Sequence, residues 1–125
     1  MKNTIESLRY LTNAKEILST KANKEDGYYQ DKKYVKLAGH AAYSGVLVAL
    51  DEALNRPKKV RVSVDWYQKE LAMRDKKVLN YFNEVYQYFH LVMGYDGFGK
   101  EKTATDTFEV ALKIIEWSES KTVLS

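Results

Sequence analysis

The fold is decided by residues 31–55, which read DKKYVKLAGHAAYSGVLVALDEALN. Apolar or small side chains would cover most of the circumference of a helix here, and a helix that is apolar nearly all round is a buried one. Gly39 and Gly45 each cost such a helix about 1 kcal/mol relative to alanine, so we expect neighbouring backbones to approach closely at these points. Asp31 is placed as an N-cap, and Pro57 ends the stretch, because the residue before a proline is disfavoured in the α region.

Glycine and proline divide the rest of the chain around this helix. They cluster near residue 27, at Pro57 and between residues 94 and 99, which leaves four helical segments. Short connections favour antiparallel neighbours. The sequence therefore predicts an all-α fold, an up-and-down four-helix bundle with a buried second helix and a long third helix, forming one domain over residues 1–125.

The two outer segments are predicted as amphipathic helices. The first begins at residue 3 or 4 and ends at Ala22, and a polar connection follows it. The fourth begins with Thr103 or Thr105 as its N-cap and ends near residue 120.

The third segment carries two stripes of side chains with seven-residue spacing. It is predicted from Ser63 to about Met93, and at about 45 Å it is longer than the outer helices can flank, so its amino-terminal end should project or bend. The stripe expected in the core consists of Leu71, Val78, Phe82, Val85, Phe89 and Val92. The second stripe consists of Tyr67, Arg74, Tyr81, Tyr88 and Tyr95.

Tyrosine suits interfaces because it has an apolar body and a polar tip. Tyr67, Tyr81 and Tyr88 are therefore the candidate interface, and self-association through the third helix, as a homodimer, is the preferred interpretation. The alternative is that these tyrosines form a second core face.

The composition limits the classes of function that the protein can have. The chain of 125 residues has 45% hydrophobic and 30% charged residues, as a folded single domain does. It has no cysteine, no apolar run long enough to span a membrane and no apolar signal segment at its start, so we expect a cytoplasmic protein without membrane partners. A net charge of +3 permits an acidic partner but is small for a nucleic-acid binder, which makes nucleic acid an unfavoured partner without excluding it.

A polar seam crosses the apolar helix. His40, Ser44 and Asp51 fall within an arc of about 40° on one helical face. His40 and Asp51 would nevertheless lie about 16 Å apart along the axis, too far for a catalytic triad. The residues of this seam either satisfy one another and nearby carbonyls or act with a group from another helix.

His90, near the end of the third helix, completes the candidate polar site with the three seam residues. An ExxH pair and cysteine are both missing, so we expect no metal, no other cofactor and no catalytic residue set.

Two further short motifs each have two interpretations. Residues 94–100 read GYDGFGK and match the G-x-x-x-x-G-K part of a P-loop. A P-loop follows a β-strand and places Ser or Thr after its lysine, whereas a helix is predicted before this segment and Glu101 follows it, so a helix-to-helix turn is favoured. The basic residues Arg56, Lys58, Lys59 and Arg61, with Lys76 and Lys77, form either a phosphate-binding surface or a solvated loop.

The first half of the chain resembles the HEPN-type helical bundles. The resemblance rests on LRYLTNAKEIL at residues 8–18 and on residues 34–51, which include AGHAAY at residues 38–43. Such bundles are four-helix proteins related to the substrate-binding partners of minimal nucleotidyltransferases. The HEPN ribonucleases carry an arginine that is separated from a following histidine by four to six residues, and neither His40 nor His90 is preceded by an arginine in this way.

The whole chain is also similar to a family of small uncharacterised proteins from Bacteroides-type bacteria, on the pattern GYDG at residues 94–97 after a helix that ends in His90. Two candidate functions follow from these sequence features and resemblances. The first is a non-enzymatic interaction or accessory protein that self-associates, with a further protein partner possible. The alternative is a HEPN-like RNA- or nucleotide-related accessory protein or degenerate nuclease, in which His40, His90 and residues 56–61 face a common groove.

Overall fold

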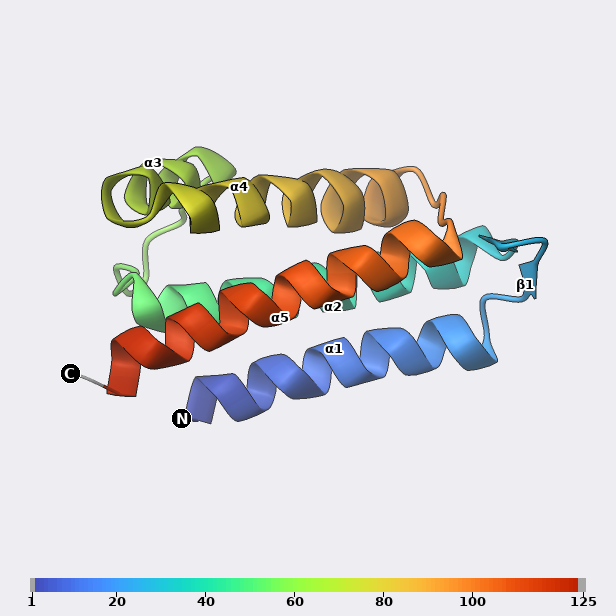
Figure 1. Cartoon of the computed structure of the whole chain (residues 1–125), viewed down its shortest axis with the longest axis horizontal. Coiled ribbons are helices and arrows are strands. Elements are labelled where there is room, and N and C mark those ends of the chain that lie inside the picture. Colours follow the sequence, from blue (N-terminus) through green and yellow to red (C-terminus); the bar gives the residue numbers. More distant parts are fainter. Residues whose placement is uncertain (1, 124–125) are drawn as a thin grey trace.

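The computed structural model describes residues 2–123, and most of them are helical (Figure 1). The all-α prediction is confirmed. The elements in chain order are α1 (Lys2–Thr20), β1 (Lys24–Glu25), β2 (Tyr28–Tyr29), α2 (Lys32–Ala53), α3 (Val64–Arg74), α4 (Lys76–Val85), the π-helical segment η1 (Tyr86–Tyr95) and α5 (Glu101–Val123). Within the described residues, no helix is both long enough and apolar enough to cross a membrane.

The long elements lie side by side along the length of the molecule (Figure 1). In that view α5 lies in front of α2, α1 lies below them, and α4 continues into η1 above them. The helix α3 folds back beside α4 at one end. Contacts with α1, η1 and α5 bury one side of α2, where Val35, Ala42 and Val46 are fully buried.

The prediction that α2 is buried all round is wrong for its remaining side. Leu37 is 51% exposed, His40 is also exposed, and Ala41 and Ser44 are half-buried. The physical reason is that three neighbours cannot enclose a central helix, and no fourth element of the described chain covers this side.

The predicted third helix is divided at Asp75, which has an extended backbone with φ −160° and ψ 104°. Its carboxylate accepts hydrogen bonds from the backbone N–H groups of Lys77 at 3.0 Å and Val78 at 3.2 Å. These bonds satisfy two donors that a new helix would otherwise leave unpaired, so α4 begins here as a separate helix. The expected bend is therefore a break.

The π-helical geometry of η1 changes which residues enter the core. In α4 the buried positions are Val78, Phe82 and Val85, with ordinary α spacing. In η1 they are Phe89, Met93 and Gly94, so the next buried positions follow Phe89 by four and five residues, as expected for i→i+5 hydrogen bonding. Val92, predicted in the core from α periodicity, is accordingly only half-buried.

A small hairpin takes the place of the predicted polar connection between the first two helices. Strands β1 and β2 are antiparallel, and the turn residues Asp26 and Gly27 have φ values of 52° and 82°, as the turn of a tight hairpin requires. The backbone N–H of Glu101 donates to the carbonyl of Gly27 at 2.8 Å. Because the hairpin supplies this acceptor, α5 begins at Glu101 and not at the predicted Thr103 or Thr105.

Candidate functional site

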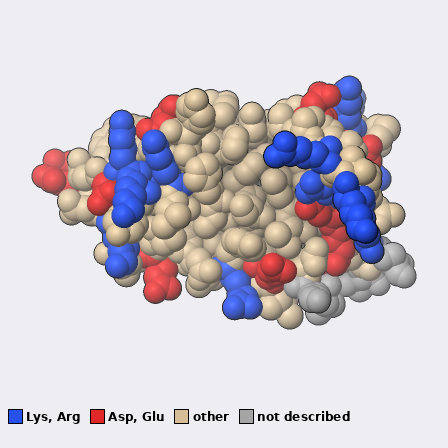
Figure 2. All heavy atoms as spheres, turned by 180° about the vertical axis from the view of Figure 1, so that it is seen from behind, with Lys and Arg blue, Asp and Glu red and all other residues tan. Residues whose placement is uncertain are grey.

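The open side of α2 forms an uncharged surface. Its outward residues, which we call the α2 face, are Leu37, His40, Ala41, Ser44, Leu47 and Val48. Residues 37–50 contain no Lys, Arg, Asp or Glu. Figure 2 shows the side of the molecule opposite α5, where uncharged residues occupy the middle and charged residues gather toward the two ends. An uncharged, partly apolar surface bordered by charge is typical of a protein contact.

The spacing along this face is that of a helix-packing seam. Leu37, Ala41, Ser44 and Val48 follow one another at intervals of four, three and four residues. Apolar or small residues in this pattern line one edge of a helix that packs against another helix. The side chains of Ala41 and Ser44 at its centre are small, so a second helix can approach closely there.

Two predicted site residues meet at the edge of the α2 face. The ring of His40, from α2, lies 6.4 Å from the ring of His90, from η1, in an edge-to-face arrangement at 69°. Gly94 makes room for this contact, because a Cβ atom there would lie 3.2 Å from the ring of His40. The sequence identified both histidines, and the tertiary structure brings them together.

Aromatic rings surround His90. Its ring lies 4.8 Å from that of Tyr43 and 5.2 Å from that of Tyr86, and its Nδ1 is buried without a hydrogen-bond partner. Burial, and to a smaller degree the neighbouring His40, hold the pKa of His90 below its ordinary value of 6.5. His90 is therefore neutral at pH 7.

Sequence reasoning missed Tyr43 and Tyr86 as neighbours of the histidines. The available signal was helical spacing, since Tyr43 follows His40 by three residues and Tyr86 precedes His90 by four. Within the described chain, neither imidazole has a hydrogen bond to a carboxylate or hydroxyl that would activate a nucleophile, and groups of three or more His, Cys, Asp or Glu side chains able to hold a metal are not found there.

Asp51 lies apart from the histidines, at the other end of the helix. Its carboxylate accepts a hydrogen bond from the Tyr67 hydroxyl at 2.5 Å and pairs with Arg56 at 3.2 Å. The Arg56 guanidinium also donates to the Tyr67 hydroxyl at 3.3 Å. The predicted polar seam is thus two separate sites, with the half-buried Ser44 between them.

The three tyrosines of the predicted interface also lie in different environments. Tyr67 is 3% exposed and stacks on Phe82, so it belongs to the core and is not available to a partner. Tyr88 is half-buried, and its hydroxyl accepts from the N–H of Lys100 at 2.8 Å and donates to the carbonyl of Lys100 at 3.2 Å. Tyr81 is half-buried beneath the ammonium of Lys113.

The two remaining motifs lie away from the histidine pair. Residues 96–100 connect η1 to α5, so the P-loop match follows a helix and not a strand. Gly97 has φ +73° and packs on the side chain of Lys32. The basic residues at positions 56–61 lie beyond the end of α2, more than about 20 Å along the helix from His40.

Comparison with known proteins supports a family assignment. A family model described as "Domain of unknown function (DUF5618)" matches residues 2–120. A solved structure of a protein of unknown function from Dyadobacter fermentans is similar to the chain, with a TM-score of 0.92 and 54% sequence identity over 95% of both chains. A search of curated proteins gave no match. The match spans nearly the whole chain, so the protein belongs to the DUF5618 family, a family of unknown function.

Proposed function

We propose that the protein is a non-enzymatic interaction protein that forms a homodimer through the α2 face. The observation that carries this proposal is the uncharged stripe of α2, whose packing seam has no partner in the described chain. Exposed apolar surface of this kind is costly in water, and a second helix would bury it. The proposed location is the cytoplasm, which the absence of cysteine supports.

A second copy of the chain fits the seam better than a charged partner. A two-fold axis places the same patch of both subunits against itself, so a self-complementary patch must carry no net charge at its centre. Residues 37–50 meet that condition. Small residues at the centre allow the two α2 helices to approach to about 8–10 Å.

The charged ends of α2 limit how the two copies can cross. Lys33 and Lys36 precede the uncharged stretch, and Asp51 and Glu52 follow it directly, so antiparallel helices in full register would bring opposite charges together. A crossing angle of about −50°, common between helices, separates these ends. Charges farther apart than about 8 Å are largely screened at physiological salt. We therefore expect a crossed dimer whose affinity changes little with added salt.

Sedimentation velocity tests the dimer. We expect the unmodified protein to be dimeric at tens of micromolar and Ser44→Glu to be monomeric, because two carboxylates would face each other near the two-fold axis. Thr12→Glu makes the same kind of change at an exposed position of α1 and serves as the matched control, which should remain dimeric. A monomeric unmodified protein, or a dimer that survives Ser44→Glu, would show the proposal to be wrong.

The HEPN-like RNA- or nucleotide-related function remains the second candidate, supported by the proximity of His40 and His90 and by basic residues beyond both ends of the α2 face. Fluorescence anisotropy with a single-stranded RNA distinguishes the two, because RNA binding weakens steeply with salt. Binding that is lost in the double variant Lys58→Gln/Lys59→Gln would favour this candidate.

A further inference from the structure

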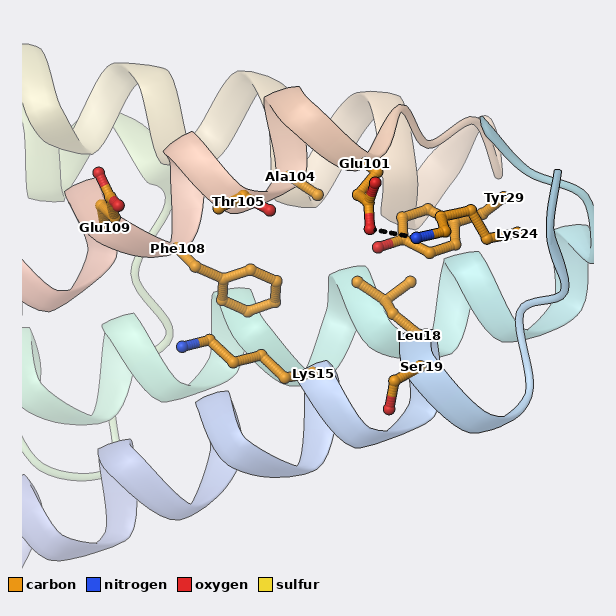
Figure 3. A pocket seen from close by; sticks show the side chains of 10 residues that line it. All are labelled: Lys15, Leu18, Ser19, Lys24, Tyr29, Glu101, Ala104, Thr105, Phe108 and Glu109. Atoms are coloured by element: carbon orange, nitrogen blue, oxygen red, sulfur yellow. Dashed lines mark hydrogen bonds and ion pairs between the residues drawn. The ribbon is translucent and has the colours of Figure 1, made fainter. Parts of the chain in front are cut away.

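A cavity of about 450 Å³ lies between α1, α5 and the hairpin (Figure 3). It is separate from the α2 face, since α1 and α5 supply most of its walls. Its volume falls within the range of small-molecule sites. The polar residues that line it include Lys15, Lys24, Tyr29, Glu101, Thr105 and Glu109.

The floor of the cavity is apolar. Leu18, Ala104 and Phe108 are each at most 4% exposed, so their side chains are already held in place by the core. The Lys15 ammonium lies 5.3 Å from the centre of the Phe108 ring, at the opposite end from the hairpin. An apolar group of a few carbon atoms that packs on this floor would be removed from contact with water without displacing the side chains beneath it.

The end of the cavity next to the hairpin is polar. The Lys24 ammonium and the Glu101 carboxylate form an ion pair at 2.5 Å, and both side chains are nearly half exposed. The Tyr29 hydroxyl points toward this pair and has no hydrogen-bond partner among the described residues (Figure 3). The Tyr29 hydroxyl is a donor at neutral pH, and burial and the charge of Glu101 raise its pKa further.

Backbone hydrogen bonds hold this polar end in place. The N–H of Tyr29 donates to the carbonyl of Gly99 at 2.9 Å, and the N–H of Glu101 donates to the carbonyl of Gly27 at 2.8 Å. The hairpin and the start of α5 are thereby joined. A ligand would meet donors and acceptors that are positioned before it binds, which lowers the entropy cost of binding.

We propose that this cavity binds a free α-amino acid with an apolar side chain. Its carboxylate would accept from the Lys24 ammonium and the Tyr29 hydroxyl, and its ammonium would donate to Glu101. Its side chain would lie on the floor formed by Leu18, Ala104 and Phe108.

The charges of the cavity favour a zwitterion over an anion or a cation. Two lysines and two glutamates line it, so a lone anion meets Glu101 and Glu109 and a lone cation meets Lys15 and Lys24. An α-amino acid carries adjacent opposite charges that match the adjacent charges of Lys24 and Glu101. An exposed ion pair contributes little to stability, so opening it for the ligand is inexpensive.

The experiment is a titration of the ¹⁵N-labelled full chain followed by NMR. The ligands are L-phenylalanine, glycine, phenylacetate and phenethylamine, which together separate the side chain, the carboxylate and the ammonium. We expect saturable shifts at the amides of Leu18, Ala104 and Phe108 with L-phenylalanine, and at least tenfold weaker binding of the other three. Equal binding of phenylacetate, or an absence of shifts at these amides, would overturn the proposal.

Variants test the residues. We expect Glu101→Gln to weaken L-phenylalanine binding at least tenfold, whereas Glu116→Gln, at an exposed position farther along α5, leaves it unchanged. Thr105→Trp places a bulky side chain in the cavity from an exposed position and should abolish binding without disturbing the core. If both cavity variants bind as the unmodified protein does, the amino acid does not occupy this cavity.

Discussion

At the scale of single residues, polar groups near the core depend on contacts between distant parts of the chain. The Tyr67 side chain is buried among aromatic rings, yet its hydroxyl reaches the Asp51 carboxylate, which also pairs with Arg56. The three residues join the end of α2, the following loop and α3. A buried hydroxyl with a charged acceptor contributes more than an ordinary hydrogen bond, because removing it leaves part of the acceptor unsatisfied.

Tyr67→Phe tests this contact. We expect the free energy of unfolding to fall by about 1.5–3 kcal/mol, the range for a hydrogen bond to a charged group. Tyr95→Phe removes a hydroxyl from a side chain that is 75% exposed and should leave stability unchanged. Urea unfolding measures both, and equal stability of the two variants would show that the Tyr67 hydroxyl contributes nothing.

His90 gives the protein a predicted pH dependence. Its pKa in the folded state is lowered by burial and by His40, whereas in the unfolded state it is near 6.5. Below pH 6.5 the unfolded state therefore binds more protons, and stability is lost as the pH falls through the lowered pKa. Thermal unfolding between about pH 5 and 8 should show this loss, and His90→Gln should reduce it. An identical pH profile for the variant would contradict the assignment to His90.

At the scale of elements, glycine sets how closely the helices pack. A Cβ atom at Gly39 would lie 2.5 Å from the carbonyl oxygen of Phe89 and 2.7 Å from the backbone N of Gly94. At Gly45 it would lie 2.7 Å from the Cβ of Tyr10. The first contact is with the backbone of η1 and cannot be relieved by a rotamer change, so Gly39 fixes the distance between α2 and η1.

Gly39→Ala should therefore destabilise the protein. Overpacking costs about 1–3 kcal/mol and exceeds the gain in helix propensity of up to about 1 kcal/mol. Ser44→Ala on the outward side of the same helix meets no such contact and is expected to be neutral or slightly stabilising. Chemical unfolding measures the free energy of unfolding of both variants. A Gly39→Ala variant more stable than the unmodified protein would contradict the close approach of α2 and η1.

The same elements show which core positions the local sequence pattern predicts correctly and which it does not. Helical periodicity correctly placed Leu71, Phe82 and Phe89 in the core, because the repeat of an α-helix is a property of the chain itself. It failed at Val92, where π-helical geometry changes the repeat. Periodicity also predicted one continuous helix through Asp75. An aspartate is compatible with both the surface of a helix and a cap position, and only the structure shows which backbone groups its carboxylate contacts.

At the scale of the whole molecule, the two candidate binding regions lie on different sides. The α2 face lies opposite α5 and is uncharged, whereas the cavity lies between α1 and α5 and is lined by balanced charges. Dimerisation through α2 would leave the cavity open to solvent. A protein–protein contact and a small-molecule site can therefore be tested independently, and failure of one proposal leaves the other standing.

The sequence by itself determined the helical class, the apolar character of residues 31–55 and the candidate residues His40, Ser44, Asp51 and His90. Tertiary structure alone decided that His40 meets His90 across fifty residues while Asp51 joins Tyr67, that one side of α2 stays open, and that the hairpin closes one end of a cavity. The reason is physical. Periodicity and breakers act over a few residues, whereas the covering of each helical face depends on how many distant neighbours reach it.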